Sequence, residues 1–238
     1  MWIKICGTTS LEDAQLAADS GADAVGFVLA PSPRRVQAEL VRRISADLPA
    51  ELEKYGVFVD AELDEIASVV TACNLTGVQL HRSSDGHLPF RLRRLFPHLR
   101  ILGVLHYQDQ APEFESQLTD LSRDQSLHAV LVDSSSPRAV GGTGSSYNWA
   151  AASSSLGRVA PHLRLIAAGG LSPRNVQQAI HILRPWGVDV VSGVESTPGR
   201  KDPARVKNFV QTARQAAQEM AKAQSQPSIT ANVGGATL

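Results

Sequence analysis

The chain lacks the features that mark several classes of protein. It has only two cysteines in 238 residues, Cys6 and Cys73, and they form no CxxC or Cys/His pattern for a metal ion. No apolar run approaches the roughly 20 residues needed to cross a bilayer. The first six residues lack the basic, apolar and small-residue regions of a signal peptide. A reducing, cytoplasmic environment without membrane association is therefore expected.

Net charge is absent as well, because 23 basic side chains balance 23 acidic ones. A neutral protein has no global field to attract nucleic acid or an anionic membrane surface, so neither is an expected partner. Any anion that the protein binds must then be held by local geometry.

Short β-rich runs alternate with longer helical patterns, which is typical of parallel βα units. Strands are predicted at residues 2–5, 24–28, 55–59, 77–80, 100–105, 129–132, 163–167 and 188–191. Helices are predicted at residues 10–20, 38–48, 62–73, 89–96, 113–122, 149–156, 173–184 and 203–223. Eight of each, in a chain of this length, predict a single (β/α)8 TIM barrel with a parallel eight-stranded sheet.

A doubly wound open sheet would show the same alternation. Its phosphate fingerprint normally lies in the first βα turn, which here reads CGTT at 6–9 and contains no GxGxxG. The glycine pairs of this chain lie late, where barrels bind phosphate after strands seven and eight. The barrel is therefore favoured.

Local signals support the element boundaries. Ser10 with Asp13 resembles a capping box, and Ser172 before Pro173 predicts an N-cap and the first residue of the seventh helix. The last helix has an apolar stripe suited to packing on a barrel, made of Val206, Phe209, Val210, Ala213, Ala217 and Met220. We expect residues 1–224 to form the barrel and residues 225–238, which are polar and small, to be a disordered or loosely attached tail.

Two residues at predicted strand ends are candidates for catalysis. Cys6 ends the first strand before a helix N-terminus and shares strand parity with Lys4, and both features would lower its thiol pKa. Asp133 closes the sixth strand, so its carboxylate would face Cys6 across the barrel mouth as an acid/base partner. The alternatives are a buried structural cysteine and an aspartate that orders the following loop; Cys73 is interpreted as core.

Three glycine-containing loops, which follow the predicted sixth, seventh and eighth strands, expose backbone N–H groups and predict a phosphate site. Exposed backbone N–H groups bind anions without net charge. The candidate residues are Gly141, Gly142, Gly144, Gly169, Gly170, Ser192 and Gly193.

Three further side chains are candidates for contact with a substrate. Arg34 follows the second strand and offers a bidentate fork for a carboxylate, with Arg35 as its competitor. His81 ends the fourth strand, where a structural histidine is an equal alternative. Asp189 lies in the eighth strand and either contacts substrate or pairs with Lys4 inside the barrel.

Taken together, the motifs resemble the phosphoribosylanthranilate isomerase family of tryptophan biosynthesis. The blocks KICG, ADAVGFV, SPR, GVF, VQLH, GGTG, AGGLSPRNV and DVVSGVE occur in the family's order, from Lys4 to Lys201. The chain departs from the family where Arg82 replaces a glycine after VQLH, in a shorter loop before SPR, and in Tyr147-Asn148-Trp149.

The resemblance implies an aldose–ketose isomerase that converts N-(5-phosphoribosyl)anthranilate to 1-(2-carboxyphenylamino)-1-deoxyribulose 5-phosphate by an Amadori rearrangement. It assigns the general base to Cys6, the general acid to Asp133, the anthranilate carboxylate to Arg34 and the phosphate to the glycine loops. It implies no metal and no organic cofactor, a sugar-phosphate substrate as partner, and a monomer or homodimer.

Two rival functions are kept. A related sugar-phosphate isomerase of histidine synthesis uses aspartate in the strand-one role, so Cys6 argues against it. A non-catalytic phosphate-binding barrel would need neither Cys6 nor Asp133.

Overall fold

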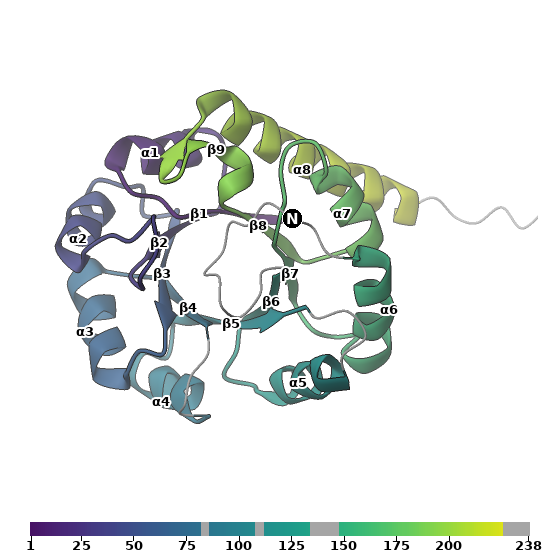
Figure 1. Ribbon diagram of the computed structural model, residues 1–238, viewed down its shortest axis with the longest axis horizontal. Helices are drawn as coiled ribbons and strands as arrows, with labels where there is room; N and C mark the ends of the chain where they lie inside the picture. Colours follow the sequence, from purple (N-terminus) through teal and green to yellow (C-terminus); the bar gives the residue numbers. More distant parts are fainter. Residues whose placement is uncertain (82–85, 108–111, 134–147, 226–238) are drawn as a thin grey trace, which may run out of the picture.

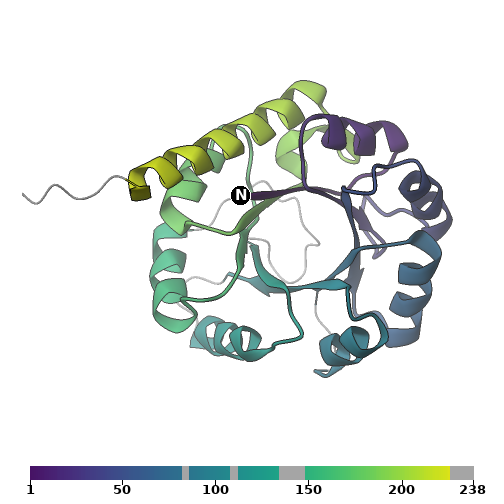
Figure 2. The same ribbon diagram turned by 180° about the vertical axis from the view of Figure 1, so that it is seen from behind.

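The protein is a closed barrel of parallel strands surrounded by helices (Figures 1 and 2). The computed structural model describes residues 1–81, 86–107, 112–133 and 148–225, and within these ranges it contains eight barrel strands and eight α-helices. The strands follow one another around the barrel in chain order, and β8 closes on β1. The predicted (β/α)8 barrel is confirmed.

The elements have the following bounds. The strands are β1 (Trp2–Cys6), β2 (Ala24–Val28), β3 (Glu53–Val59), β4 (Gly77–His81), β5 (Arg100–His106), β6 (Ala129–Asp133), β7 (Leu165–Ala167) and β8 (Gly187–Val190). The helices are α1 (Leu11–Asp19), α2 (Ala38–Ala46), α3 (Leu63–Cys73), α4 (Leu88–Leu95), α5 (Pro112–Arg123), α6 (Trp149–Val159), α7 (Val176–Leu183) and α8 (Pro203–Ser225).

Several predicted boundaries differ from the structure by two or three residues, among them those of α7 and α8, and one connection was not predicted. The helix α7 begins at Val176 rather than Pro173, because the Asn175 side chain accepts a hydrogen bond from the Ser172 backbone N–H and holds a turn before the helix. The helix α8 continues to Ser225, and residues 226–238 lie outside the described residues. After β8, a 3₁₀ turn η1 (Ser192–Val194) leads into a small hairpin of β9 (Glu195–Thr197) and β10 (Arg200–Lys201).

The predicted cap of the first helix is confirmed. Ser10 Oγ accepts a hydrogen bond from the Asp13 backbone N–H at 3.1 Å, which satisfies one of the free donors at the start of α1.

The parity of β1 decides which of its side chains enter the barrel. Ile3 and Ile5 are fully buried in the main apolar core. Lys4, on the opposite face, reaches across the interior to hydrogen-bond Gln79 in β4 and Asp189 in β8. Because side chains alternate along a strand, Cys6 points to the same side as Lys4.

The last helix covers the junction where the barrel closes. It packs against α7 and α1 and contacts β1, as both views show (Figures 1 and 2). Its predicted stripe is buried at Val206, Phe209, Val210 and Ala213, and Ala216 takes the buried place expected for Ala217. The apolar stripe therefore joins the two ends of the barrel sequence.

Aromatic rings and one carboxylate close the amino-terminal end of the barrel. Trp2 stacks on Trp186 at 5.3 Å between ring centroids and meets Tyr55 edge-on at 5.7 Å. Glu53 accepts hydrogen bonds from the indole of Trp2 and the hydroxyl of Tyr55, and pairs with Arg100. Rings of this size exclude water from the amino-terminal end of the barrel interior.

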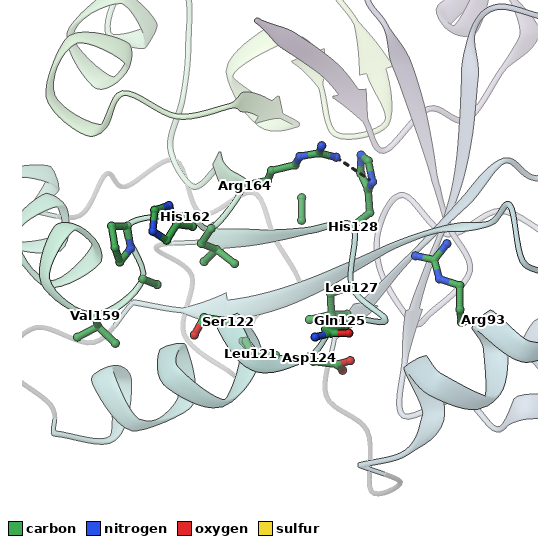
Figure 3. Close-up of a pocket in the computed structure, with 14 residues that line it drawn as sticks. Arg93, Leu121, Ser122, Asp124, Gln125, Leu127, His128, Val159, His162 and Arg164 are labelled. Carbon is green, nitrogen blue, oxygen red and sulfur yellow. Dashed lines mark hydrogen bonds between the residues drawn. The ribbon is translucent and has the colours of Figure 1, made fainter.

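A hollow of about 460 Å³ lies beside this end, between the segments that precede β6 and β7 (Figure 3). Arg164 points toward His128, and its guanidinium lies over the ring of Trp186 at 5.8 Å. None of the predicted site residues lines this hollow. Burial, with smaller effects of Arg100, Arg164 and Arg93, lowers the pKa of His128 to about 4.

The depressed pKa of His128 predicts a loss of stability in mild acid. The unfolded chain binds this proton near pH 6.5 and the folded protein only near pH 4, so stability present above pH 6.5 falls as the pH drops toward 4. The ring is partly exposed, so the loss is expected to be on the order of 1–2 kcal/mol. Urea unfolding at pH 7 and pH 4.5 measures it. The variant His128→Gln should flatten the pH dependence, whereas His162→Gln, at an exposed histidine of the same hollow, should not.

Candidate active site

Five of the predicted site residues line a single cavity at the carboxyl ends of the strands. They come from β1, β4, β6, β8 and the loop after β2, and are Cys6, His81, Asp133, Asp189 and Arg34. Ser32, Gln79 and three valines complete the lining. Elements far apart in the chain thus bring the predicted groups together, because parallel strands end at the same face of the barrel.

The cavity is the floor of a site rather than its whole volume. It measures about 30 Å³, which is room for about one or two water molecules. The loop after β6, which carries the predicted Gly141, Gly142 and Gly144, lies outside the described residues.

Cys6 is buried, with 3% of its surface exposed. Burial raises the pKa of its thiol; Lys4 and Lys201 lower it and Asp189 raises it, and the net shift is upward. The prediction of a lowered thiol pKa is therefore wrong for this structure. Helix and lysine were expected to dominate, but removal of the thiolate from water outweighs them.

Gly26 makes room for Cys6. The two residues are register partners in β1 and β2. A Cβ atom at Gly26 would lie 2.6 Å from Cys6 Sγ and 2.9 Å from Lys4 Cε, both shorter than contact distance. The absence of a side chain at this strand position sets where the thiol sits.

A polar chain runs beneath the cavity. Lys4 Nζ donates to Asp189 Oδ1 and Gln79 Oε1, both at 2.8 Å, and the Gln79 amide nitrogen lies 2.8 Å from His81 Nε2. Burial lowers the pKa of Lys4, but attraction to Asp189 and Cys6 outweighs it and the net shift is upward. The lysine thus remains charged. For Asp189 the sequence predicted either contact with substrate or pairing with Lys4, and the pairing is confirmed. Gln79 was not predicted, although it lies in the VQLH motif.

Arg34 is buried and Arg35 exposed, as predicted for a site arginine and its competitor. Arg34 already has a carboxylate partner: its Nε donates to Glu195 Oε1 at 2.8 Å and its Nη2 to Glu195 Oε2 at 2.7 Å. Glu195 was not predicted. The motif SGVE contains it, but only Ser192 and Gly193 were taken from that motif.

The described glycine loops adopt conformations that require glycine. Gly169 and Gly170 have φ of 80° and 64°, the left-handed region that side chains rarely adopt. At Gly193 a Cβ atom would lie 1.9 Å from the carbonyl oxygen of Leu171, so the loops after β7 and β8 touch. Among the described residues, no group of three or more His, Cys, Asp or Glu is arranged to hold a metal ion.

A family model described as N-(5'-phosphoribosyl)anthranilate (PRA) isomerase matches residues 3–212. The chain belongs to this isomerase family. The N-(5'-phosphoribosyl)anthranilate isomerase of Geobacter sp. strain M21 is 41% identical over 214 residues, which cover 89% of this chain and 97% of the relative.

Solved structures of the isomerase family have the same fold. The phosphoribosyl anthranilate isomerase of Thermotoga maritima has a TM-score of 0.79 and 34% identity, covering 90% of this chain and 99% of that one. A phosphoribosyl anthranilate isomerase in complex with reduced 1-(o-carboxyphenylamino)-1-deoxyribulose 5-phosphate has a TM-score of 0.76 and 32% identity, with the same coverage.

Family membership favours the isomerase over both rival functions.

None of the helices in the described ranges has the length and apolar character that a bilayer span requires.

The close packing of Gly26 against Cys6 predicts that a methyl group added at residue 26 lowers both the stability and the activity of the isomerase. Gly26→Ala should push the Cys6 thiol from its place, lower the free energy of unfolding by about 1–3 kcal/mol, and reduce kcat by about tenfold or more. Steady-state kinetics and urea unfolding measure the two effects. Gly157→Ala in α6 is the control, since a Cβ there meets nothing within 4 Å. Wild-type kcat in folded Gly26→Ala would show that the thiol position is not set by this contact.

Proposed function

We propose that Cys6 and Asp133 are the base and the acid of the Amadori rearrangement of N-(5-phosphoribosyl)anthranilate, the reaction of this isomerase family in tryptophan biosynthesis. The observation that supports these roles is their presence in one buried cavity, at the ends of β1 and β6, together with Arg34. An acid and a base on different sides of a pocket suit a reaction that adds a proton at one atom and removes it from another.

The chemistry has two steps. A protonated Asp133 donates its proton to the furanose ring oxygen, the C1–O bond breaks, and the nitrogen lone pair forms a C1=N⁺ iminium. The Cys6 thiolate then removes the proton on C2, which the adjacent iminium has made acidic. The C–H electron pair forms the C1=C2 bond of an enolamine, which tautomerises to the ketone. The substrate nitrogen is the electron sink, so the reaction requires no cofactor.

The raised pKa of Cys6 explains when the base becomes effective. A buried thiol is protonated at rest, which limits its side reactions. Formation of the positively charged iminium in the same low-dielectric cavity stabilises the thiolate. Lys4, held by Asp189 on the cavity floor, adds a permanent positive charge near the sulfur.

The remaining predicted residues are proposed to bind the substrate. Arg34 faces the cavity and takes the anthranilate carboxylate, and His81 and Asp189 contact the sugar from the cavity wall. The phosphate lies on the bare backbones of the loops after β6, β7 and β8. A cytoplasmic location and a monomeric or homodimeric state remain predictions.

Removal of either proposed group should abolish most turnover. Cys6→Ala and Asp133→Asn are each expected to lower kcat by roughly 10²–10⁴-fold, since one proton transfer is lost. The decrease in fluorescence of freshly made phosphoribosylanthranilate measures turnover, and circular dichroism checks the fold. Substantial activity in either folded variant would remove that residue from the mechanism. No turnover by the wild-type protein would favour a non-catalytic phosphate-binding barrel.

The pH profile should show the high thiol pKa. Because the reaction needs a deprotonated base and a protonated acid, kcat/KM of the free enzyme should pass through a maximum, and its fall on the alkaline side should lie above about pH 8.5, the ordinary value for a thiol, since the pKa of Cys6 is raised. Stopped-flow or steady-state measurements from pH 6 to 10 test this. A fall in kcat/KM that begins below about pH 8 would contradict the raised pKa.

A further inference from the structure

We propose that Glu195 is a positioning residue for the carboxylate end of the substrate: it fixes Arg34 from behind, and Lys201 fixes Glu195 to the ends of β1 and β8. This inference rests on the proposed function, in which Arg34 binds the anthranilate carboxylate. Glu195 does not line the cavity, so it acts only through Arg34.

The pairing of Glu195 with Arg34 determines the plane of the guanidinium. Two parallel hydrogen bonds, from Nε at 2.8 Å and from Nη2 at 2.7 Å, engage both carboxylate oxygens. A fork-to-fork pair of this kind allows little rotation. Within the described residues Nη1 makes no hydrogen bond, and it is the part of the fork left for a second carboxylate.

Lys201 anchors Glu195 to the catalytic strand. Its Nζ donates to the Cys6 carbonyl at 2.6 Å, to Glu195 Oε1 at 3.2 Å and to the Val191 carbonyl at 3.3 Å, so all three protons are used. Lys201 and Glu195 are register partners in the β9–β10 hairpin. The ammonium group therefore links Arg34, through Glu195, to the backbone of the proposed base.

The stem of Arg34 is held from the other side by Gly7. A Cβ atom at Gly7 would lie 2.8 Å from Arg34 Cδ, and Gly7 has a φ of 71°. The residue that follows Cys6 thus packs directly on Arg34. Bonds at the head and packing at the stem leave the arginine one orientation.

The charges of the cluster favour a substrate carboxylate. Its ion pairs join two cations, Arg34 and Lys201, to one carboxylate, Glu195, and all three residues are at least 93% buried. Burial raises the pKa of Glu195, but Arg34 and Lys201 outweigh it and the net shift is downward. Glu195 therefore stays ionised, and a second anion beside Arg34 would complete the pairing.

Glu195 stays paired with Arg34 when the substrate binds, and the substrate carboxylate does not displace it. Its oxygens also accept bonds from Lys201 and from the Gly199 backbone N–H at 3.3 Å. A swing away from Arg34 would leave a buried carboxylate and a buried ammonium poorly paired, which is costly.

The test compares two inhibitors, of which only one has the carboxyphenylamino group that carries the carboxylate. The reduced product, reduced 1-(o-carboxyphenylamino)-1-deoxyribulose 5-phosphate, has the carboxylate, and ribulose 5-phosphate lacks it. In Glu195→Gln the inhibition constant of the reduced product should rise about tenfold or more, because the neutral amide cannot accept both bonds from Arg34. That of ribulose 5-phosphate should change by less than about twofold, because the phosphate loops are untouched.

A double-mutant cycle separates positioning from a general effect on the fold. Arg34→Met should raise the same inhibition constant, and Glu195→Gln should add little to it, since the residues act as one unit. Glu39→Gln, at an exposed glutamate that pairs with Arg42 on α2, is the matched control and should change nothing. Equal loss of affinity for both inhibitors, no loss for either, or effects that multiply in the double variant would each overturn the proposal.

A second variant covers the case in which Glu195→Gln does not fold. Glu195→Asp keeps the charge and shortens the side chain, and should raise the ratio of the two inhibition constants in the same direction by a smaller factor. An unchanged ratio in this variant would also overturn the proposal. If Cys6→Ala were fully active while the ratio shifted as expected, the catalytic assignment would fail and the positioning of Arg34 would stand.

Discussion

The pairing of β1 with β8 is the constraint on which the rest of the structure depends. It closes the barrel and sets residues 4 and 189 opposite one another, so that a lysine and an aspartate at the two ends of the sequence form an ion pair at 2.8 Å. Inside a barrel neither group could remain charged alone, because desolvation would be too costly. The same strand pairing therefore closes the barrel, forms the ion pair and places charged groups at the floor of the cavity. The helix α8 covers this junction from outside and contributes its apolar stripe to the same closure.

The site built on this floor is narrow and contains several ionisable groups. A buried thiol and two carboxylates from three strands line a cavity of about 30 Å³, and Lys4 lies beneath it, paired with Asp189. Burial raises the pKa of Cys6 and, in the mechanism proposed above, also strengthens the attraction between its thiolate and a positive charge that forms in the substrate. A base that becomes strong only when the iminium is present suits a reaction whose first step creates that cation. The opposite end of the barrel is sealed by Trp2, Trp186 and Tyr55, and this arrangement serves stability.

The elements and the principal site residues could be predicted because their signals are local. Cys6 and Asp133 end apolar runs, and strand ends of a barrel converge whatever their separation in sequence. The roles of Gln79, Glu195 and Lys201 could not be predicted, since each depends on a partner at least 75 residues away or on the hairpin after β8. The prediction of a lowered pKa for the Cys6 thiol was wrong for a related reason. The neighbouring helix and lysine can be recognised in the sequence motif, whereas the depth to which the thiol is buried depends on the whole fold. The start of α7 shifted because the Asn175 side chain stabilises a turn, a competition that Ser172-Pro173 does not reveal.

The segment after β8 connects the three points at which the proposed reaction holds its substrate. Gly193 lies against Leu171 in the loop after β7, beside the predicted phosphate site. Glu195, two residues later, determines the orientation of Arg34, and Lys201 binds the carbonyl of Cys6. Ten consecutive residues, 192–201, thus contact Leu171, Arg34 and Cys6, which belong to the proposed phosphate site, the proposed carboxylate site and the proposed base. Since effective catalysis requires reacting groups to keep their spacing within a fraction of an ångström, contacts of one segment with all three points help to maintain it. The short hairpin of β9 and β10, which no local motif predicted, thus supports Arg34 and the end of β1 as well as connecting β8 to α8.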